Sequence, residues 1–216
     1  MNDSKIRAFG VDNADTYWQE RESVGRTSEK RVHLFIRELV FKYTKPPGNV
    51  LICGVGDGHE YRLCAERIDT WGVEMSQYAI DQYEFDTDKI INADLNNGIP
   101  EFPVKFNAIT VSMVLHWLDD PEQFLIGAKS SLEPNGCLVV IIPNITYYRY
   151  RLGFLMGHFP PISPSHKNFQ TSSEVEQMFL RAGFNIVERS ASKNAMKTRM
   201  WPRLFATDIG YVLKPE

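Results

Sequence analysis

A short apolar run that ends in closely spaced glycines constrains this chain more than any other feature. The run spans residues 50–53 and is followed, at every second position, by Gly54, Gly56 and Gly58. An apolar run of this length predicts a strand that is buried on both faces, and the glycines allow the main chain to turn tightly and approach a ligand. Residues 59–68 then predict a helix whose free N–H groups face the same place. Strand, turn and helix together predict a nucleotide-type pocket.

After this turn the sequence alternates between short apolar runs and helical patterns. Further strands are expected over residues 70–74, 89–93, 106–113, 137–142, 184–189 and 204–213, with helices over 76–85, 120–132 and 171–183. This alternation predicts an α/β fold with a doubly wound, seven-stranded, largely parallel sheet. The last two strands have no helix-length apolar pattern between them. We therefore expect them to form an antiparallel pair.

The 216 residues are expected to form a single domain with four parts. Residues 1–45 are expected to form an N-terminal helical cap, with helices over 15–21 and 27–43. Residues 46–143 are expected to form the ligand-binding core. The Pro-rich and aromatic segment 144–170 is expected to be a lid or substrate-binding insertion. Residues 171–216 predict a C-terminal helix and strand pair.

Composition argues against several classes of partner. The net charge is −3 and Lys and Arg are scattered singly, which is atypical of proteins whose main partner is nucleic acid or an anionic membrane. No apolar run approaches the roughly 18 residues of a membrane span, so a cytoplasmic location is expected. The cysteines lack metal-ligand spacing, and we expect no metal and three buried free thiols: Cys53, Cys64 and Cys137.

Acidic residues follow two successive strands of the predicted sheet. Ligands of such sheets lie beyond the carboxyl ends of the central strands. Glu74 can accept hydrogen bonds from both hydroxyls of a ribose, and Asp94 from the exocyclic amine of adenine. Met75 and Leu95 offer apolar faces to the base. Either acid alone could merely cap the next helix, but two of them beside the glycine turn predict a nucleoside site.

A nicotinamide dinucleotide is the alternative ligand, because an acid about 20 residues after the first glycine also belongs to its fingerprint. That fingerprint requires a third glycine at the sixth position, which here is His59. The spacing is G-x-G-x-G, with Gly58 one residue early. This spacing suits a ligand without a pyrophosphate.

Over residues 17–213 these motifs resemble the class I S-adenosylmethionine-dependent methyltransferases. The similar segments are residues 50–58, 72–76, 93–95 and 132–136. The resemblance implies S-adenosyl-L-methionine as cofactor, S-adenosyl-L-homocysteine as product, and methyl transfer to oxygen or nitrogen of a small-molecule acceptor. It implies cofactor-binding roles for Gly54, Val55, Gly56, Asp57, Gly58, Glu74, Met75, Asp94, Leu95 and Ser112, with Tyr17, Arg21 and Arg26 as candidates for the carboxylate end.

Within that superfamily the second half of the chain is most similar to the MetW-like proteins of methionine biosynthesis. The similar segments are residues 93–98, 142–144, 150–152, 157–162 and 200–206. This narrower resemblance implies an alternative function, that of a non-catalytic partner or regulatory subunit of an acyltransferase. A homodimer is a further possibility for its assembly.

One departure from the methyltransferase pattern lies at Ile52, where the family usually has an acid near the ammonium group of the ligand. An apolar residue removes one electrostatic partner from that cation. Binding is then either weakened, or the amine is held by Glu60, by Asp57 or by a main-chain carbonyl such as that of Ser112.

The acceptor is expected near the end of the fourth strand and in the 144–170 insertion. His116 is the candidate general base, needed only for a poorly acidic hydroxyl or a protonated amine. It fits equally well as a half-buried residue beside its neighbour Trp117. Candidate acceptor-binding residues are Trp117, Asn144, Tyr147, Tyr148 and Arg149.

Overall fold

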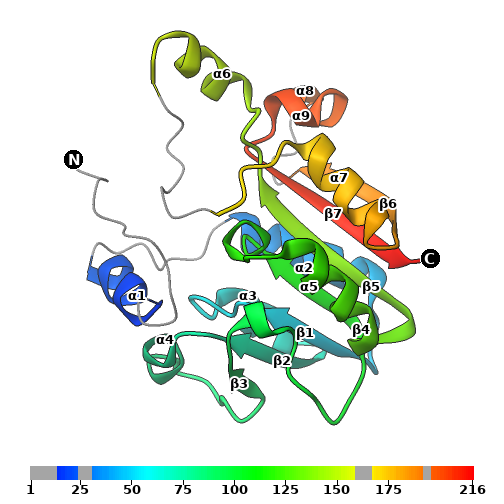
Figure 1. Cartoon of the computed structure of the whole chain (residues 1–216). Coiled ribbons are helices and arrows are strands. Elements are labelled where there is room, and N and C mark those ends of the chain that lie inside the picture. The colour runs from blue at the N-terminus through cyan, green and yellow to red at the C-terminus, as the bar shows by residue number, and fades with distance from the viewer. Residues whose placement is uncertain (1–13, 24–30, 159–166, 192–195) are drawn as a thin grey trace.

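The computed structural model describes residues 14–23, 31–158, 167–191 and 196–216. A seven-stranded sheet in the order β3-β2-β1-β4-β5-β7-β6 runs through the molecule (Figure 1). Its strands are β1 (Asn49–Cys53), β2 (Asp69–Glu74), β3 (Ile90–Asn92), β4 (Phe106–Ser112), β5 (Leu132–Pro143), β6 (Phe184–Ala191) and β7 (Asp208–Pro215).

The pairing confirms the predicted α/β fold class. Strands β3, β2, β1, β4 and β5 pair in parallel. Strand β7 inserts antiparallel between β5 and β6, so the predicted antiparallel pair of last strands is also confirmed. The chain order reverses between β1 and β4. Such a switch point is where open α/β sheets bind their ligands.

Helices lie on both sides of this sheet (Figure 1). They are α1 (Ala14–Ser23), α2 (Arg31–Tyr43), α3 (His59–Ala65), α4 (Gln77–Asp81), α5 (Pro121–Ala128), α6 (Tyr148–Leu155), α7 (Ser172–Arg181), α8 (Met196–Met200) and α9 (Pro202–Phe205). Short 3-10 turns add η2 (Leu95–Asn97), η3 (Leu115–Trp117) and η4 (Lys129–Ser131). None of these described helices is long and apolar enough to cross a membrane.

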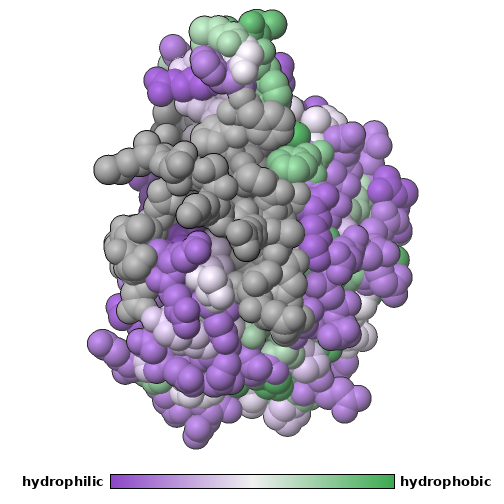
Figure 2. Space-filling view, turned by 60° about the vertical axis from the view of Figure 1, so that its left-hand side comes forward, coloured by the Kyte–Doolittle hydropathy of each residue, from purple (hydrophilic) through white to green (hydrophobic). Residues whose placement is uncertain are grey.

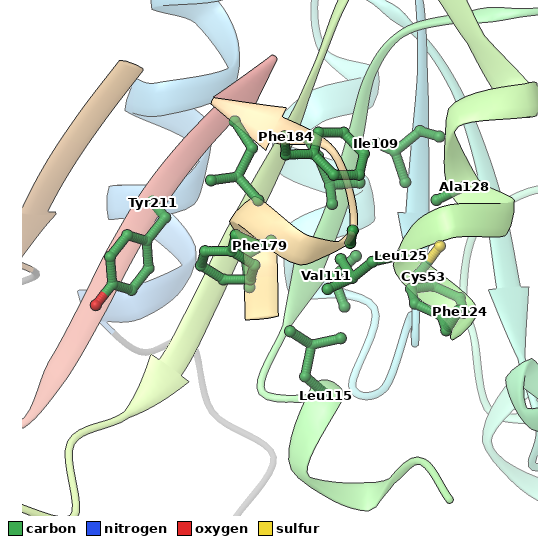
Figure 3. Close-up of a cluster of buried hydrophobic side chains, with 14 of the residues drawn as sticks. Cys53, Ile109, Val111, Leu115, Phe124, Leu125, Ala128, Phe179, Phe184 and Tyr211 are labelled. Carbon is green, nitrogen blue, oxygen red and sulfur yellow. The ribbon is translucent and has the colours of Figure 1, made fainter. Parts of the chain in front are cut away.

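The alternation of side chains along β1 divides the core into two layers. Leu51 and Cys53 face the layer under α5 and α7, whereas Val50 and Ile52 face the layer under α2 and α3. Figure 3 shows the first layer, in which aromatic side chains of α5, α7, β6 and β7 surround the sheet. Phe179 and Tyr211 meet there edge to face, with ring centroids 5.2 Å apart.

Two helix starts follow the local sequence signals. The Thr171 hydroxyl accepts a hydrogen bond from the N–H of Glu174, whose side chain accepts from the N–H of Thr171, so the predicted capping box is present. Asp120 accepts from the N–H of Gln123 and is followed by Pro121 at the first helical position. Both predictions are confirmed.

Several predicted boundaries are wrong. Strand β5 begins at Leu132 rather than at residue 137, because Leu132 already pairs with Phe106 of β4. Residues 133–136 form an irregular stretch, and regular pairing resumes at Cys137 opposite Ala108. Helix α4 ends at Asp81, and the chain then turns so that Phe85 stacks on Tyr61 at 5.0 Å. The last strand starts at Asp208, since residues 196–205 form α8 and α9. The start of the helix expected over 27–43 lies outside the described residues, as do Arg26 and 159–162.

Candidate functional site

A cavity of about 540 Å³ opens at the carboxyl ends of β1, β2 and β4, at the switch point of the sheet. This volume suits a ligand of nucleoside size or larger. Helices α1 and α2 supply further walls. The structure brings most of the predicted site residues to this cavity, namely Tyr17, Arg21, Gly54, Val55, Gly56, Asp57, Glu74, Met75, Asp94, Leu95, Ser112 and Trp117.

The glycine turn forms one wall of the cavity. The N–H groups of Gly54 and Val55 both donate to the carbonyl of Val73, at 2.8 and 3.2 Å, which ties the turn to β2. Gly56 has a φ of +64°, and a Cβ at this position would lie 3.2 Å from the ring of Trp18 in α1. The turn therefore needs glycine for its conformation and for the approach of α1.

Gly58 has a different role from the other two glycines of the motif. It does not line the cavity. A Cβ on it would lie 2.8 Å from the ring of Phe85, and its φ is +75°. Gly58 therefore allows the turn to pack on the aromatic residues that follow α4, although the sequence predicts a ligand contact there.

Glu74 is buried at the end of β2 and holds the glycine turn. One of its oxygens accepts from the N–H of Gly56 at 2.8 Å and the other from the N–H of Ser76 at 2.9 Å. Burial raises the pKa of this carboxyl group, and these main-chain hydrogen bonds act in the opposite direction. The acid is thus fixed in orientation beside the cavity.

Asp94 lines the cavity at the end of β3 and also caps η2. Its Oδ1 atom accepts from the main-chain N–H of Asn96 at 2.9 Å and from the side-chain amide of the same residue at 3.0 Å. Asp94 therefore caps the helix that follows it, which is the alternative role that the sequence analysis left open for this acid. Both contacts use Oδ1, so capping does not involve Oδ2.

Helix α1 lies against the cavity and is held there by Asp15. The Asp15 carboxylate accepts from the Ser76 hydroxyl at 2.5 Å and from the N–H of Tyr78 at 3.0 Å, both at the start of α4. Tyr17 packs edge to face on Trp117 across the cavity, with centroids 6.2 Å apart. Arg21 donates to the Tyr17 hydroxyl at 2.7 Å. The predicted pair Tyr17 and Arg21 therefore covers the site from one side.

A second buried acid, Glu60 of α3, also lines the cavity. It accepts a hydrogen bond from the hydroxyl of Thr110 in β4. Burial raises the pKa of Glu60 to about 7, the hydrogen bond from Thr110 lowers it, and the charge of nearby Asp57 raises it. Thr110 is the register partner of Ile52, so Glu60 approaches the sheet beside the position where an acid is missing from β1.

The cavity also contains residues that the sequence analysis did not single out. Among them are Trp18, His33, Asp119 and Lys167. His33 Nε2 lies 3.7 Å from Asp57 Oδ1, and Lys167 pairs with Asp119 at 2.5 Å. A polar side chain within the apolar stripe of α2 was the available signal for His33. No local pattern indicated Lys167, because the sequence of the long segment before it does not show which strand end Lys167 lies near.

The structure does not bring His116 or the acceptor candidates of the insertion, Asn144, Tyr147, Tyr148 and Arg149, to this cavity. His116 is buried, and lies instead in a neighbouring small cavity with Asn168 and Phe169. Asn144 is also buried, and its amide donates to the carbonyls of Arg203 and Ala206 at 3.0 and 2.8 Å. The remaining candidates, at the start of α6, are Tyr147, Tyr148 and Arg149.

Several solved structures have a similar fold. A SAM-dependent methyltransferase from Archaeoglobus fulgidus aligns with a TM-score of 0.66 and 19% identity over 92% of this chain and 99% of its own. A S-adenosylmethionine-dependent methyltransferase from Clostridium acetobutylicum gives 0.65 and 15% over 93% and 98%. The glycopeptide N-methyltransferase MtfA gives 0.61 and 14% over 85% and 90%. At these identities the likeness is one of fold.

The sequence itself matches a family model described as a methyltransferase domain over residues 25–189. No curated protein matches the chain. The narrower resemblance to MetW is not tested by these matches and stays a prediction. The family match covers most of the chain, including the glycine turn and the acids at the ends of β2 and β3. The chain therefore belongs to the methyltransferase domain family.

Proposed function

We propose that this protein binds S-adenosylmethionine in the cavity at the switch point and transfers its methyl group to a small-molecule acceptor. The observation that carries the proposal is the buried carboxylate of Glu74, held against the glycine turn beside a cavity of about 540 Å³. A fixed, buried acid at the end of β2 suits a ligand with neighbouring hydroxyl groups.

The nucleoside end of the ligand fits the residues of β2 and β3. In our proposal Glu74 accepts hydrogen bonds from the ribose hydroxyls and Asp94 accepts from the adenine amine through Oδ2. Met75 and Leu95 line the same cavity and supply apolar surface for the base. Gly54 and Gly56 have positive φ angles and leave the main chain close to the ligand.

The amino-acid end of the ligand carries a carboxylate and an ammonium group. Arg21, held by Tyr17, is our candidate donor to the carboxylate. Glu60 is our candidate partner for the ammonium group and takes the role that Ile52 cannot perform. Its support is the contact with Thr110 beside Ile52 and its place in the cavity wall. An ammonium ligand would also stabilise the ionised form of this buried acid.

When bound, S-adenosylmethionine supplies an electrophilic methyl group on a sulfonium, so the protein mainly has to align the acceptor and exclude water. Tyr17, Trp18 and Trp117 are the aromatic residues that would shield the site. His33 lies in the cavity next to Asp57 and is better placed than His116 to hold an acceptor proton. His116 as general base and the acceptor roles of Asn144, Tyr147, Tyr148 and Arg149 remain predictions.

Calorimetric titration with S-adenosylmethionine and S-adenosylhomocysteine, with NAD as control, tests the proposal. We expect both adenosyl ligands to bind, NAD not to bind, and binding to be lost in Glu74→Ala and Gly56→Val. Absence of binding by the wild type would overturn the cofactor assignment, and binding of NAD alone would indicate an oxidoreductase. Binding without methyl transfer to any acceptor, together with a co-purified acyltransferase, would indicate the partner-subunit alternative.

A further inference from the structure

Exposed apolar side chains gather on one part of the surface. Leu155 is 84% exposed, Met156 67% and Met196 79%. Together with four neighbours they form what we call the α6–α8 surface: Leu152, Phe154, Leu155, Met156, Met196, Met200 and Trp201. Figure 2 shows hydrophobic side chains at the top of the molecule, where Figure 1 places α6. The other large apolar residues that are exposed in the described part of the chain lie elsewhere, at Ile126, Phe169, Leu180 and Val187.

The segment that contains α6 contacts the segment that contains α8 and α9. The ring of Tyr148 at the start of α6 packs on Phe205 of α9, with centroids 5.5 Å apart. Phe205 in turn lies 6.4 Å from the ring of Trp201. The Thr146 hydroxyl donates to the carbonyl of Arg203 at 3.1 Å. Helices α6, α8 and α9 are therefore in contact and lie at the same end of the protein (Figure 1).

The same helices concentrate positive charge. Although the chain has a net charge of −3, α6, α8 and α9 contain five basic residues and no acidic one. Arg203 pairs with Glu176 of α7 at 2.7 Å. In the described part of the chain no acidic side chain forms an ion pair with the exposed residues Arg149, Arg151 and Lys197. An apolar surface bordered by basic residues is the composition of segments that lie in the headgroup region of membranes.

We propose that the α6–α8 surface docks on the surface of an anionic lipid membrane. Arg149, Arg151 and Lys197 contact lipid phosphates, and the apolar side chains enter the boundary between headgroups and acyl chains. Each basic residue near such a surface contributes to binding, and the attraction weakens with salt. Since none of the described helices can cross a membrane, the association is peripheral. It does not depend on the identity of the methyl acceptor.

Other occupants fit these residues less well. A second copy docked on the same patch would place its basic residues against those of the first. Three successive apolar residues close this segment, Phe154 and Leu155 at the end of α6 and Met156 directly after it, and successive side chains point in different directions around a helix. Fluid lipid surrounds such a tip more readily than a flat protein surface does. Five of the seven side chains of the surface are aliphatic and stack poorly on nucleic-acid bases, which favours lipid over RNA.

Co-sedimentation with vesicles tests the apolar half of the proposal. We expect the full chain to bind vesicles of phosphatidylcholine mixed with phosphatidylglycerol, and to bind vesicles of phosphatidylcholine alone far more weakly. Leu155→Glu should weaken binding roughly tenfold or more, because it removes an inserted side chain and adds a repelled charge. The matched control Ile126→Glu changes an exposed apolar residue on α5 and should bind as the wild type does.

Charge reversal tests the electrostatic half. Arg149→Glu combined with Lys197→Glu should reduce binding to the anionic vesicles at least tenfold, and salt should mimic the effect. Lys45→Glu is the control, since Lys45 is exposed near the opposite ends of the strands, before β1. Equal binding to both kinds of vesicle, no binding, or a dimer that Leu155→Glu abolishes would each overturn the proposal. Titration of the same variants with S-adenosylhomocysteine measures cofactor binding independently of vesicle binding. A failure of the membrane proposal can therefore be distinguished from a failure of the cofactor assignment.

Discussion

The carboxylate of Glu74 at the end of β2 accepts a hydrogen bond from the main-chain N–H of Gly56 at 2.8 Å. This contact joins two segments that lie 18 positions apart in the sequence. Its other oxygen accepts from the N–H of Ser76, which opens α4. Glu74 therefore links the glycine turn to the start of α4 and fixes the geometry of this wall of the cavity.

Replacing this acid tests its double role. Glu74→Gln keeps one acceptor oxygen but turns an NH2 group towards a main-chain N–H. We expect a loss of about 1–3 kcal/mol in the free energy of unfolding, because a buried donor loses its partner. Affinity for S-adenosylhomocysteine should fall roughly tenfold or more. Urea denaturation and calorimetry measure the two effects. Glu84→Gln, an exposed acid after α4, should change neither, and equal behaviour of the two variants would contradict the role of Glu74.

A comparison of two glycines isolates the contact with α1. Gly56 and Gly98 both have positive φ angles, +64° and +90°. A Cβ on Gly56 meets the ring of Trp18 at 3.2 Å, whereas a Cβ on Gly98 has no neighbour within 4 Å. Both Gly56→Val and Gly98→Val should lose stability through backbone strain of order 1–3 kcal/mol. Only Gly56→Val should also lose ligand binding, by roughly tenfold or more in calorimetry. If both variants bound the ligand with similar affinity, backbone strain alone would explain the effect of Gly56→Val, and the contact with Trp18 would have no role in binding.

The position of α1 depends on Asp15, whose carboxylate accepts from Ser76 and Tyr78 of the α4 segment. Asp15→Ala removes both contacts and should release α1 from the cavity. We expect affinity for S-adenosylhomocysteine to fall about tenfold, with a small change in overall stability. Asp15→Asn keeps an acceptor oxygen and should restore most of the binding. Faster hydrogen exchange of the Tyr78 amide in Asp15→Ala, and not in Asp15→Asn, would identify the cause.

Much of the fold follows from local patterns in the sequence. The alternation of strands and helices predicts the parallel sheet, because successive parallel strands need a crossover connection, which is usually a helix packed on a face of the sheet. The boundaries of β5 and β7 are wrong because Pro, Asn and Gly in residues 133–136 read as a turn, and because α8 and α9 are too short to show an apolar period. Such segments take their structure from neighbours that the sequence does not reveal.

The candidate site is only partly visible in the sequence. The glycines and the acids Glu74 and Asp94 follow strands, and a sheet brings its strand ends together. The contacts of Asp15 and Trp18 depend on how α1 lies on the cavity, and α1 has no apolar stripe that would predict it. The basic residues of α6, α8 and α9 are likewise scattered in the sequence, which gives no sign that these three helices lie next to one another.

The buried acid Glu60 should make stability depend on pH in an unusual direction. Burial raises its pKa from 4.5 to about 7. As pH rises between these values the unfolded chain loses the proton before the folded protein does, so the free energy of unfolding falls, and the fall ends above about pH 7. The shift corresponds to about 3 kcal/mol. Glu60→Gln removes this titration, and its stability relative to the wild type should rise by about that amount across the interval.

Urea denaturation of both proteins at several pH values measures this difference, with Glu66→Gln, an exposed acid beside the end of α3, as the matched control. The control should keep the pH profile of the wild type. A ligand ammonium group beside Glu60 favours the ionised form, so binding of S-adenosylhomocysteine below about pH 7 should release a proton. Calorimetry in buffers of different ionisation enthalpy detects that proton. A release that is unchanged in Glu60→Gln would show that Glu60 does not bind the ammonium group.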